Sequence, residues 1–156
     1  MGFFDNLRCH APLPFPPDLE PSLVAKLQAS VWQTKDLDCF LDDYELRADG
    51  SLWHQLYDVE DRSDPTAEGL ARLVGMLSRV NERWVPMTDY VGVITFYECL
   101  SKGCSGWLDF RATIVDGRLH RPIELLTYRP IDPAVEAERE ENLKRTFESL
   151  GSEEPA

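Results

Sequence analysis

Two Asp-Gly pairs, at positions 49–50 and 116–117, restrict the fold of this chain more than any other feature. Glycine adopts without strain the positive φ that a tight hairpin turn requires, so Asp-Gly between β-forming runs is the strongest short-range signal for a β-hairpin. The runs that flank the two turns cover residues 44–47, 52–57, 107–115 and 118–128. The sequence therefore predicts an antiparallel sheet built on two Asp-Gly hairpins.

Alternating or continuous apolar residues indicate two further strands. Residues 90–100 form a mostly apolar run and are predicted to be a buried strand. In the acidic stretch 36–42, apolar residues alternate with aspartates, as in a strand with one buried and one solvated face; they are Leu37, Cys39 and Leu41 against Asp36, Asp38 and Asp42. On this interpretation the apolar side chains point to the core and the aspartates to water.

Helical spacing of apolar residues occurs in three places. A short helix is predicted over 22–30, and longer ones over 66–83 and 133–150. The sequence thus predicts an α+β fold, with an antiparallel sheet of about five strands and the two longer helices packed against one face.

Length and composition fit one domain. A chain of 156 residues can bury a hydrophobic core, and an apolar content of 43% excludes wholesale disorder. We expect residues 1–150 to form this domain and 151–156 to be an acidic, frayed tail. Four prolines within 11–17 exclude a helix there, so this segment is either a free ligand for an aromatic groove or, as we expect, laid over the fold with Leu13 and Phe15 covered.

Negative charge is concentrated in one part of the chain. The net charge is −12, and residues 36–68 contain eleven acidic residues against Arg47 and Arg62, a balance of −9. An acidic face repels phosphate backbones, so direct nucleic-acid binding is not expected. The same face suits a basic protein surface, although solubility alone would also account for it.

The sequence carries no signal for a membrane or for export. No apolar run reaches the roughly 18 residues of a membrane span, and the first residues lack the pattern of a signal peptide. A cytoplasmic location is therefore expected. The four cysteines are predicted to be free thiols, namely Cys9, Cys39, Cys99 and Cys104.

The acidic stretch offers oxygen ligands for a cation. Asp36, Asp38, Asp42 and Asp43 carry the carboxylates that Mg²⁺ and Ca²⁺ prefer. Their spacing fits no EF-hand loop, and an extended strand separates successive side chains on one face by about 6.5 Å. Chelation would require the strand to break. The aspartates are therefore predicted to form a solvated rim, and no cofactor is expected.

Cysteine and histidine near the N-terminus suggest an alternative. Cys9 and His10 are adjacent, and Cys39 would lie beside them if the first segment paired with residues 36–40. Zinc normally takes four such ligands; the fourth would be His54, Cys99 or Cys104, and the spacing selects none of them. This interpretation would make the protein a zinc-binding module or a metal-dependent enzyme.

The sequence lacks the common signatures of catalysis. It contains no Gly-x-Ser-x-Gly elbow, no phosphate loop and no dinucleotide fingerprint, so we expect a protein that is not an enzyme. Trp53, which has acidic residues on either side, is a candidate anchor at an interface. Together with Asp36, Asp38, Asp42 and Asp43 it makes up the predicted partner surface.

Four segments occur in this order within residues 1–126: MGFFDNLRCHAPLP, QTKDLDCFLDDYELRADGSLW, VGVITFY and GWLDFRATIVDGRL. They resemble a family of uncharacterised proteins of bacteria and their phages or prophages, and the QTKDLDC string is the most specific part. The chain differs from that pattern by a helix-like segment before Val31 and by a longer helix between the strand groups. The resemblance implies a mobile-element context and no particular activity.

The expected function is that of a non-enzymatic, acidic protein-binding module of phage or mobile-element origin. Such a module could act as an inhibitor or immunity-type factor that engages a basic partner through residues 36–64. The alternative is the zinc module or metal-dependent enzyme that uses Cys9, His10 and Cys39.

Overall fold

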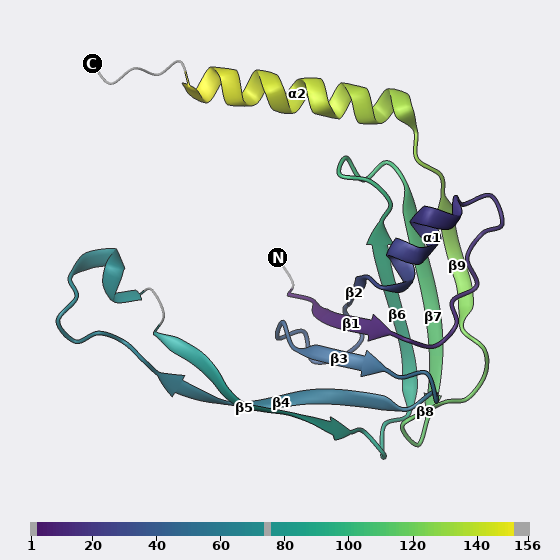
Figure 1. Ribbon diagram of the computed structural model, residues 1–156, viewed down its shortest axis with the longest axis horizontal. Helices are drawn as coiled ribbons and strands as arrows, with labels where there is room; N and C mark the ends of the chain where they lie inside the picture. Colours follow the sequence, from purple (N-terminus) through teal and green to yellow (C-terminus); the bar gives the residue numbers. More distant parts are fainter. Residues whose placement is uncertain (1–2, 74–75, 152–156) are drawn as a thin grey trace.

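The computed structural model describes residues 3–73 and 76–151 and shows an α+β fold with two helices and a mostly antiparallel sheet (Figure 1). The predicted fold class is confirmed, but the sheet has nine strands rather than about five. Several of the additional strands are short, and a strand of two to five residues is too short to show a clear alternating pattern.

The elements in chain order are β1 (Asp5–Cys9), α1 (Pro21–Gln28), β2 (Val31–Thr34), β3 (Asp43–Leu46), β4 (Leu52–Asp61), the 3₁₀ helix η1 (Gly69–Leu73), β5 (Leu77–Pro86), β6 (Gly92–Cys99), β7 (Trp107–Val115), β8 (Arg118–Leu119), β9 (Glu124–Arg129) and α2 (Pro133–Gly151). In space the strands follow the order β5-β4-β3-β1-β2-β6-β7-β8, and β9 also pairs with β7. The β1–β3 pair is parallel, and the other described pairs are antiparallel.

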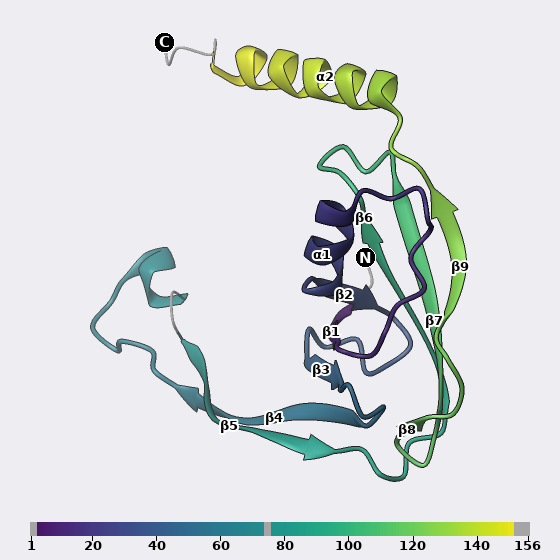
Figure 2. The same cartoon turned by 45° about the vertical axis from the view of Figure 1, so that its right-hand side comes forward.

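The two predicted Asp-Gly turns are present, and they lie against each other. Gly50 and Gly117 adopt φ angles of +83° and +70°, in the region that glycine tolerates best. The N–H of Leu52 donates to the carbonyl oxygen of Gly117, and the N–H of Leu119 donates to that of Gly50, both at 2.8 Å. These bonds join the β3–β4 turn to β8, at the other end of the strand order, so the sheet is strongly bent (Figure 2).

Aromatic side chains form the centre of the core. Trp32 packs edge-to-face against Phe96 and Phe110, with ring centroids 5.7 and 5.3 Å apart, and all three are fully buried. The proline-rich segment lies over this core as expected. Leu13 is buried, and Phe15 packs against Phe110 at 5.6 Å.

The helix predicted over 66–83 is wrong. Its first part contains only the short η1, and Leu77–Pro86 forms β5, which pairs along β4. Gly69 has a φ of +63°, which interrupts a right-handed helix. The long-range pairing with β4 then outweighs the helical spacing of the apolar residues. Residues 74–75 lie outside the described residues.

The other two predicted helices are confirmed. The helix expected over 22–30 is α1, which buries Leu27, and the helix expected over 133–150 is α2. Neither α-helix of the described residues is long and apolar enough to cross a membrane. The cytoplasmic location stays a prediction, and the acidic tail falls almost wholly at 152–156, outside the described residues.

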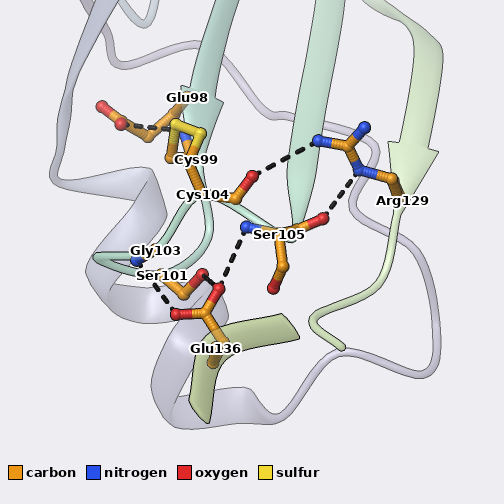
Figure 3. The surroundings of a disulfide bond; sticks show 8 residues. All are labelled: Glu98, Cys99, Ser101, Gly103, Cys104, Ser105, Arg129 and Glu136. Atoms are coloured by element: carbon orange, nitrogen blue, oxygen red, sulfur yellow. Dashed lines mark hydrogen bonds between the residues drawn. A yellow bond between two sulfur atoms is a disulfide. The ribbon is translucent and has the colours of Figure 1, made fainter. Parts of the chain in front are cut away.

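Cys99 and Cys104 form a disulfide in the loop between β6 and β7, so the prediction of four free thiols is wrong for this pair (Figure 3). The loop folds back and brings their Cα atoms to 5.0 Å, within the usual range for a disulfide. Sequence spacing does not reveal this fold-back. Cys9 and Cys39 are free thiols, as predicted.

The same loop anchors the first turn of α2. The carboxylate of Glu136 accepts hydrogen bonds from the Ser101 hydroxyl at 2.6 Å and from the N–H groups of Gly103 and Ser105 at 2.9 and 3.0 Å (Figure 3). These bonds, with that of Ser101 the largest, lower the pKa of Glu136 to about 2. Farther along, α2 extends away from the sheet and exposes Leu143 and Phe147 (Figures 1 and 2).

Candidate functional site

The acidic stretch predicted as a strand is a loop between β2 and β3, organised by a buried carboxylate. Asp5 in β1 is fully buried, and its oxygens accept the N–H groups of Cys39 at 2.6 Å, Phe40 at 2.9 Å and Asp42 at 3.0 Å. Cys39 and Leu41 adopt φ angles of +59° and +61°, which a strand does not allow. The strand prediction for 36–42 is therefore wrong, because the chain turns so that its backbone N–H groups donate to the buried carboxylate of Asp5.

The four aspartates predicted as a solvated rim differ in exposure: Asp36 and Asp38 are exposed, Asp42 is buried, and Asp43, the first residue of β3, is half-buried. Asp36 accepts the N–H of Thr95 at 2.6 Å and so ties the loop to β6. Asp38 accepts the hydroxyl of Tyr44 at 2.7 Å. Asp42 is only 9% exposed. Asp36 and Asp38 thus stay exposed while they bind other groups of the protein, whereas Asp42 is turned inward.

Asp43, the fourth aspartate, faces a cation. Its Oδ2 lies 3.1 Å from Nη1 of Arg79 in β5, and its Oδ1 accepts Nδ2 of Asn6 at the same distance. Arg79 also donates to the carbonyl oxygen of Leu41 at 2.9 Å and stacks over the Tyr57 ring at 4.2 Å. This arginine therefore holds β5 against the acidic loop.

Asp42 and His54 meet at the base of the loop. Nε2 of His54 lies 3.5 Å from Oδ2 of Asp42, and the other oxygen of Asp42 accepts the Tyr57 hydroxyl at 2.8 Å. The Nε2 atom is buried and makes no hydrogen bond. The imidazole is stacked on the ring of Tyr44 with centroids 4.4 Å apart, because Tyr44 and His54 are cross-strand partners on β3 and β4.

Three potential metal ligands converge here. One ligand atom from each of Asp38, Asp42 and His54 lies within 4.8 Å of the others. Burial, followed by the hydrogen bond to Asp38, raises the pKa of Tyr44 above its usual range. The hydrogen bond to Asp42 is the main reason that the pKa of Tyr57 is also raised. Both phenols therefore stay protonated and donate to the carboxylates.

Trp53 is engaged within the protein. The guanidinium of Arg47 lies 3.7 Å from the centre of its ring, and its indole N–H donates to the Ser51 hydroxyl at 2.8 Å. Trp53 lies on β4, whose neighbouring residue His54 turns to the opposite face. The structure therefore separates this tryptophan from the Asp42–His54 contact.

The structure does not bring Cys9, His10 and Cys39 together as a metal cluster. Cys9 is buried at the end of β1, and burial raises the pKa of its thiol to about 12, which keeps it protonated at neutral pH. The His10 side chain is about half exposed and lies 3.5 Å from Glu45. Cys39 lies beside Asp5, at the opposite end of β1.

The sequence does not connect two residues of the site with the aspartates: it offers His54 as a possible fourth zinc ligand and does not single out Asp5. His54 could have been found, since the Asp-Gly turn fixes the register that places it opposite Tyr44. Asp5 has no comparable signal, because its partners are backbone groups more than thirty positions away.

A second feature of the acidic segment is a projecting arm. We define the arm as residues 58–61 of β4, residues 77–80 of β5 and the described residues between them. In both views it extends away from the rest of the fold (Figures 1 and 2). Val59, Leu70 and Leu77 are 58%, 81% and 69% exposed. The arm thus presents apolar side chains to solvent.

No family model matches the chain, and the searches of curated proteins and of solved structures found no match either. The resemblance to bacterial and phage proteins therefore stays a prediction.

Proposed function

We propose that the protein is a non-enzymatic, acidic protein-binding module that engages a basic partner surface through the acidic segment 36–64. One observation carries the proposal: the arm projects from the fold with apolar and acidic side chains exposed together. We assign the contact surface to the arm because the predicted aspartates already bind other groups of the protein, namely Asp36, Asp38, Asp42 and Asp43.

The arm is a two-stranded ribbon for which a partner is expected. β5 is an edge strand, and the outer pairs, such as Val59 with Arg79 and Asp61 with Leu77, have β4 and β5 alone to stabilise them. A two-stranded ribbon by itself is marginally stable in water, and an exposed edge strand is a template for further pairing. A protein that covered Val59 and Leu77 would remove apolar surface from water and stabilise the ribbon.

Charge selects the kind of partner. The arm exposes five acidic side chains around its apolar residues, against three exposed basic ones, Arg62, Arg72 and Arg79; the acidic ones are Asp58, Glu60, Asp61, Asp64 and Glu68. A surface of this sign accelerates the encounter with a basic protein and disfavours an acidic one. Asp43 at the start of β3 supports the arm, because it binds Arg79 at the base of the arm.

The resemblance to phage and prophage proteins supports an inhibitor or immunity-type role. Proteins of this kind act by covering a surface of another protein and need no catalytic group of their own. The partner is accordingly expected to carry a basic patch, such as the one with which a nucleic-acid-binding protein contacts phosphates.

The test is capture of a partner with matched charge variants. The arm variant combines Asp58→Asn, Glu60→Gln and Asp61→Asn. The control makes the same charge change on α2 with Glu138→Gln, Glu140→Gln and Glu141→Gln. We expect a basic protein to be retained by the wild type and the control, to be lost from the arm variant, and to be released as NaCl rises from about 0.05 to about 0.5 M.

Equal retention by the arm variant and the control would contradict the proposal. Loss from both variants would also contradict it, because net charge rather than the arm would then determine binding.

A further inference from the structure

We infer that Asp38, Asp42 and His54 bind a divalent transition-metal ion of the Zn²⁺ type, between the loop before β3 and the start of β4. The inference does not depend on the proposed partner, because these side chains lie at the base of the arm and not on its exposed surface.

The geometry brings suitable donors to one point. The three ligand atoms lie within 4.8 Å of one another, so small side-chain rotations suffice to place all three around one ion. The residues come from a loop and a strand that the buried Asp5 carboxylate and the β3–β4 pairing hold in place. Asp38 is exposed, which leaves a path for an ion from solvent.

The imidazole of His54 distinguishes this group from a cluster of carboxylates alone. Nε2 of His54 is buried without a hydrogen bond, although it points toward Asp42 at 3.5 Å. A buried polar atom without a partner is costly, and most such atoms in native proteins are satisfied. A metal ion that accepts the lone pair of Nε2 would satisfy it.

The phenols orient the carboxylates for this role. Tyr44 donates to Oδ2 of Asp38, and Tyr57 donates to Oδ1 of Asp42. Each bond occupies one oxygen, fixes the carboxylate and leaves the second oxygen available. Outer-shell hydrogen bonds of this type hold the ligands in known metal sites.

The local charge favours a cation. The carboxylates of Asp38 and Asp42 meet beside His54, and Arg79 lies 3.9 Å from Asp42 and 3.1 Å from Asp43. A divalent ion would reduce the repulsion between the carboxylates. One imidazole with two carboxylates suits Zn²⁺ or Mn²⁺ better than Mg²⁺ or Ca²⁺, which prefer ligand sets made of oxygen.

The experiment uses the full chain and Co²⁺ as a spectroscopic probe, with Zn²⁺ as competitor. We expect visible d–d absorption that Zn²⁺ abolishes, without a thiolate-to-cobalt charge-transfer band. Asp38→Asn and His54→Gln should each weaken binding by about 10-fold or more. Asp36→Asn is the control, because it removes the same charge two positions away and should leave the affinity unchanged.

Asp38 is exposed, so Asp38→Asn keeps the test valid if His54→Gln prevents folding. Failure of Co²⁺ and Zn²⁺ to bind at millimolar concentration would overturn the inference. A thiolate band would do the same, because it would place the metal at Cys9 or Cys39. An equal loss of affinity in Asp38→Asn and Asp36→Asn would also overturn the inference, because it would show that the ion responds to nearby negative charge rather than to coordination by Asp38. None of these results bears on capture of a protein by the arm.

Discussion

Oδ2 of Asp5 lies 2.6 Å from the backbone nitrogen of Cys39, across a sequence separation of 34 residues. The other oxygen accepts the N–H groups of Phe40 and Asp42. A buried acid of the first strand thus sets the course of the loop that carries the aspartates. The acidic segment owes its shape to a residue outside it.

Replacing Asp5 with asparagine should strongly destabilise the protein. The amide offers one acceptor oxygen where the carboxylate offers two, and its NH₂ group would face N–H donors of the loop. We expect a loss of about 2–4 kcal/mol in the free energy of unfolding, measured by urea denaturation. Asp89→Asn, at an exposed position, is the matched control and should leave stability nearly unchanged. Equal stability of the two variants would contradict the role given to Asp5.

Glu136 should make the anchoring of α2 dependent on pH. Because the folded-state pKa is lowered from 4.5 to about 2, its contribution is present above pH 4.5 and is lost as the pH falls toward 2. Amide exchange of Gly103 and Ser105, corrected for the intrinsic effect of pH, should therefore become faster over this range. In Glu136→Gln the corrected exchange should be faster at pH 7 and lack this dependence on pH. A wild-type profile that is flat between pH 5 and 2 would refute this assignment.

Reduction of the Cys99–Cys104 disulfide should loosen the loop that holds Glu136. Closing a loop this short stabilises the folded state by about 2 kcal/mol in the chain-entropy model. In reductant we expect the free energy of unfolding to fall by about this amount and the amide of Gly103 to exchange faster. The double variant Cys99→Ser/Cys104→Ser should match the reduced wild type and should not respond to reductant. Unchanged exchange at Gly103 on reduction would show that the disulfide does not support the anchor.

Because the two Asp-Gly turns pack against each other, we expect two glycine substitutions to reduce the stability of the protein by different amounts. A Cβ at Gly117 would overlap the carbonyl oxygen of Met87, whereas one at Gly69 meets no atom within 4 Å. Both glycines have positive φ, so Gly69→Ala measures the backbone strain alone, about 1 kcal/mol. In thermal denaturation, Gly117→Ala should destabilise the protein clearly more than Gly69→Ala does. Similar costs would mean that the turn is not tightly packed.

Local signals in the sequence were sufficient for the hairpins and for α2. Asp49-Gly50 and Asp116-Gly117 specify their turns through adjacent residues, and α2 follows Asp132-Pro133, a local start signal. Their formation needs little information from the rest of the chain. Their meeting in space, by contrast, depends on the bend of the whole sheet.

The failures at β5 and at the loop before β3 both involve distant partners. β5 shows helical spacing, but its pairing with β4 decides its structure. The loop before β3 shows strand alternation, but Asp5 bends it. The aspartates were recognised as a group, whereas their contact with His54 depends on that bend and on the β3–β4 register.

The measurement that most directly tests the central claim is hydrogen exchange of the protein alone and in complex with the captured basic partner. Free in solution, the outer arm pairs Val59–Arg79, Glu60–Ser78 and Asp61–Leu77 should exchange quickly, because they belong to an exposed two-stranded ribbon. In the complex the same amides should become protected, while those of α2 beyond its first turn stay unchanged. Protection confined to other parts of the chain, with the arm exchanging as fast as in the free protein, would contradict the account.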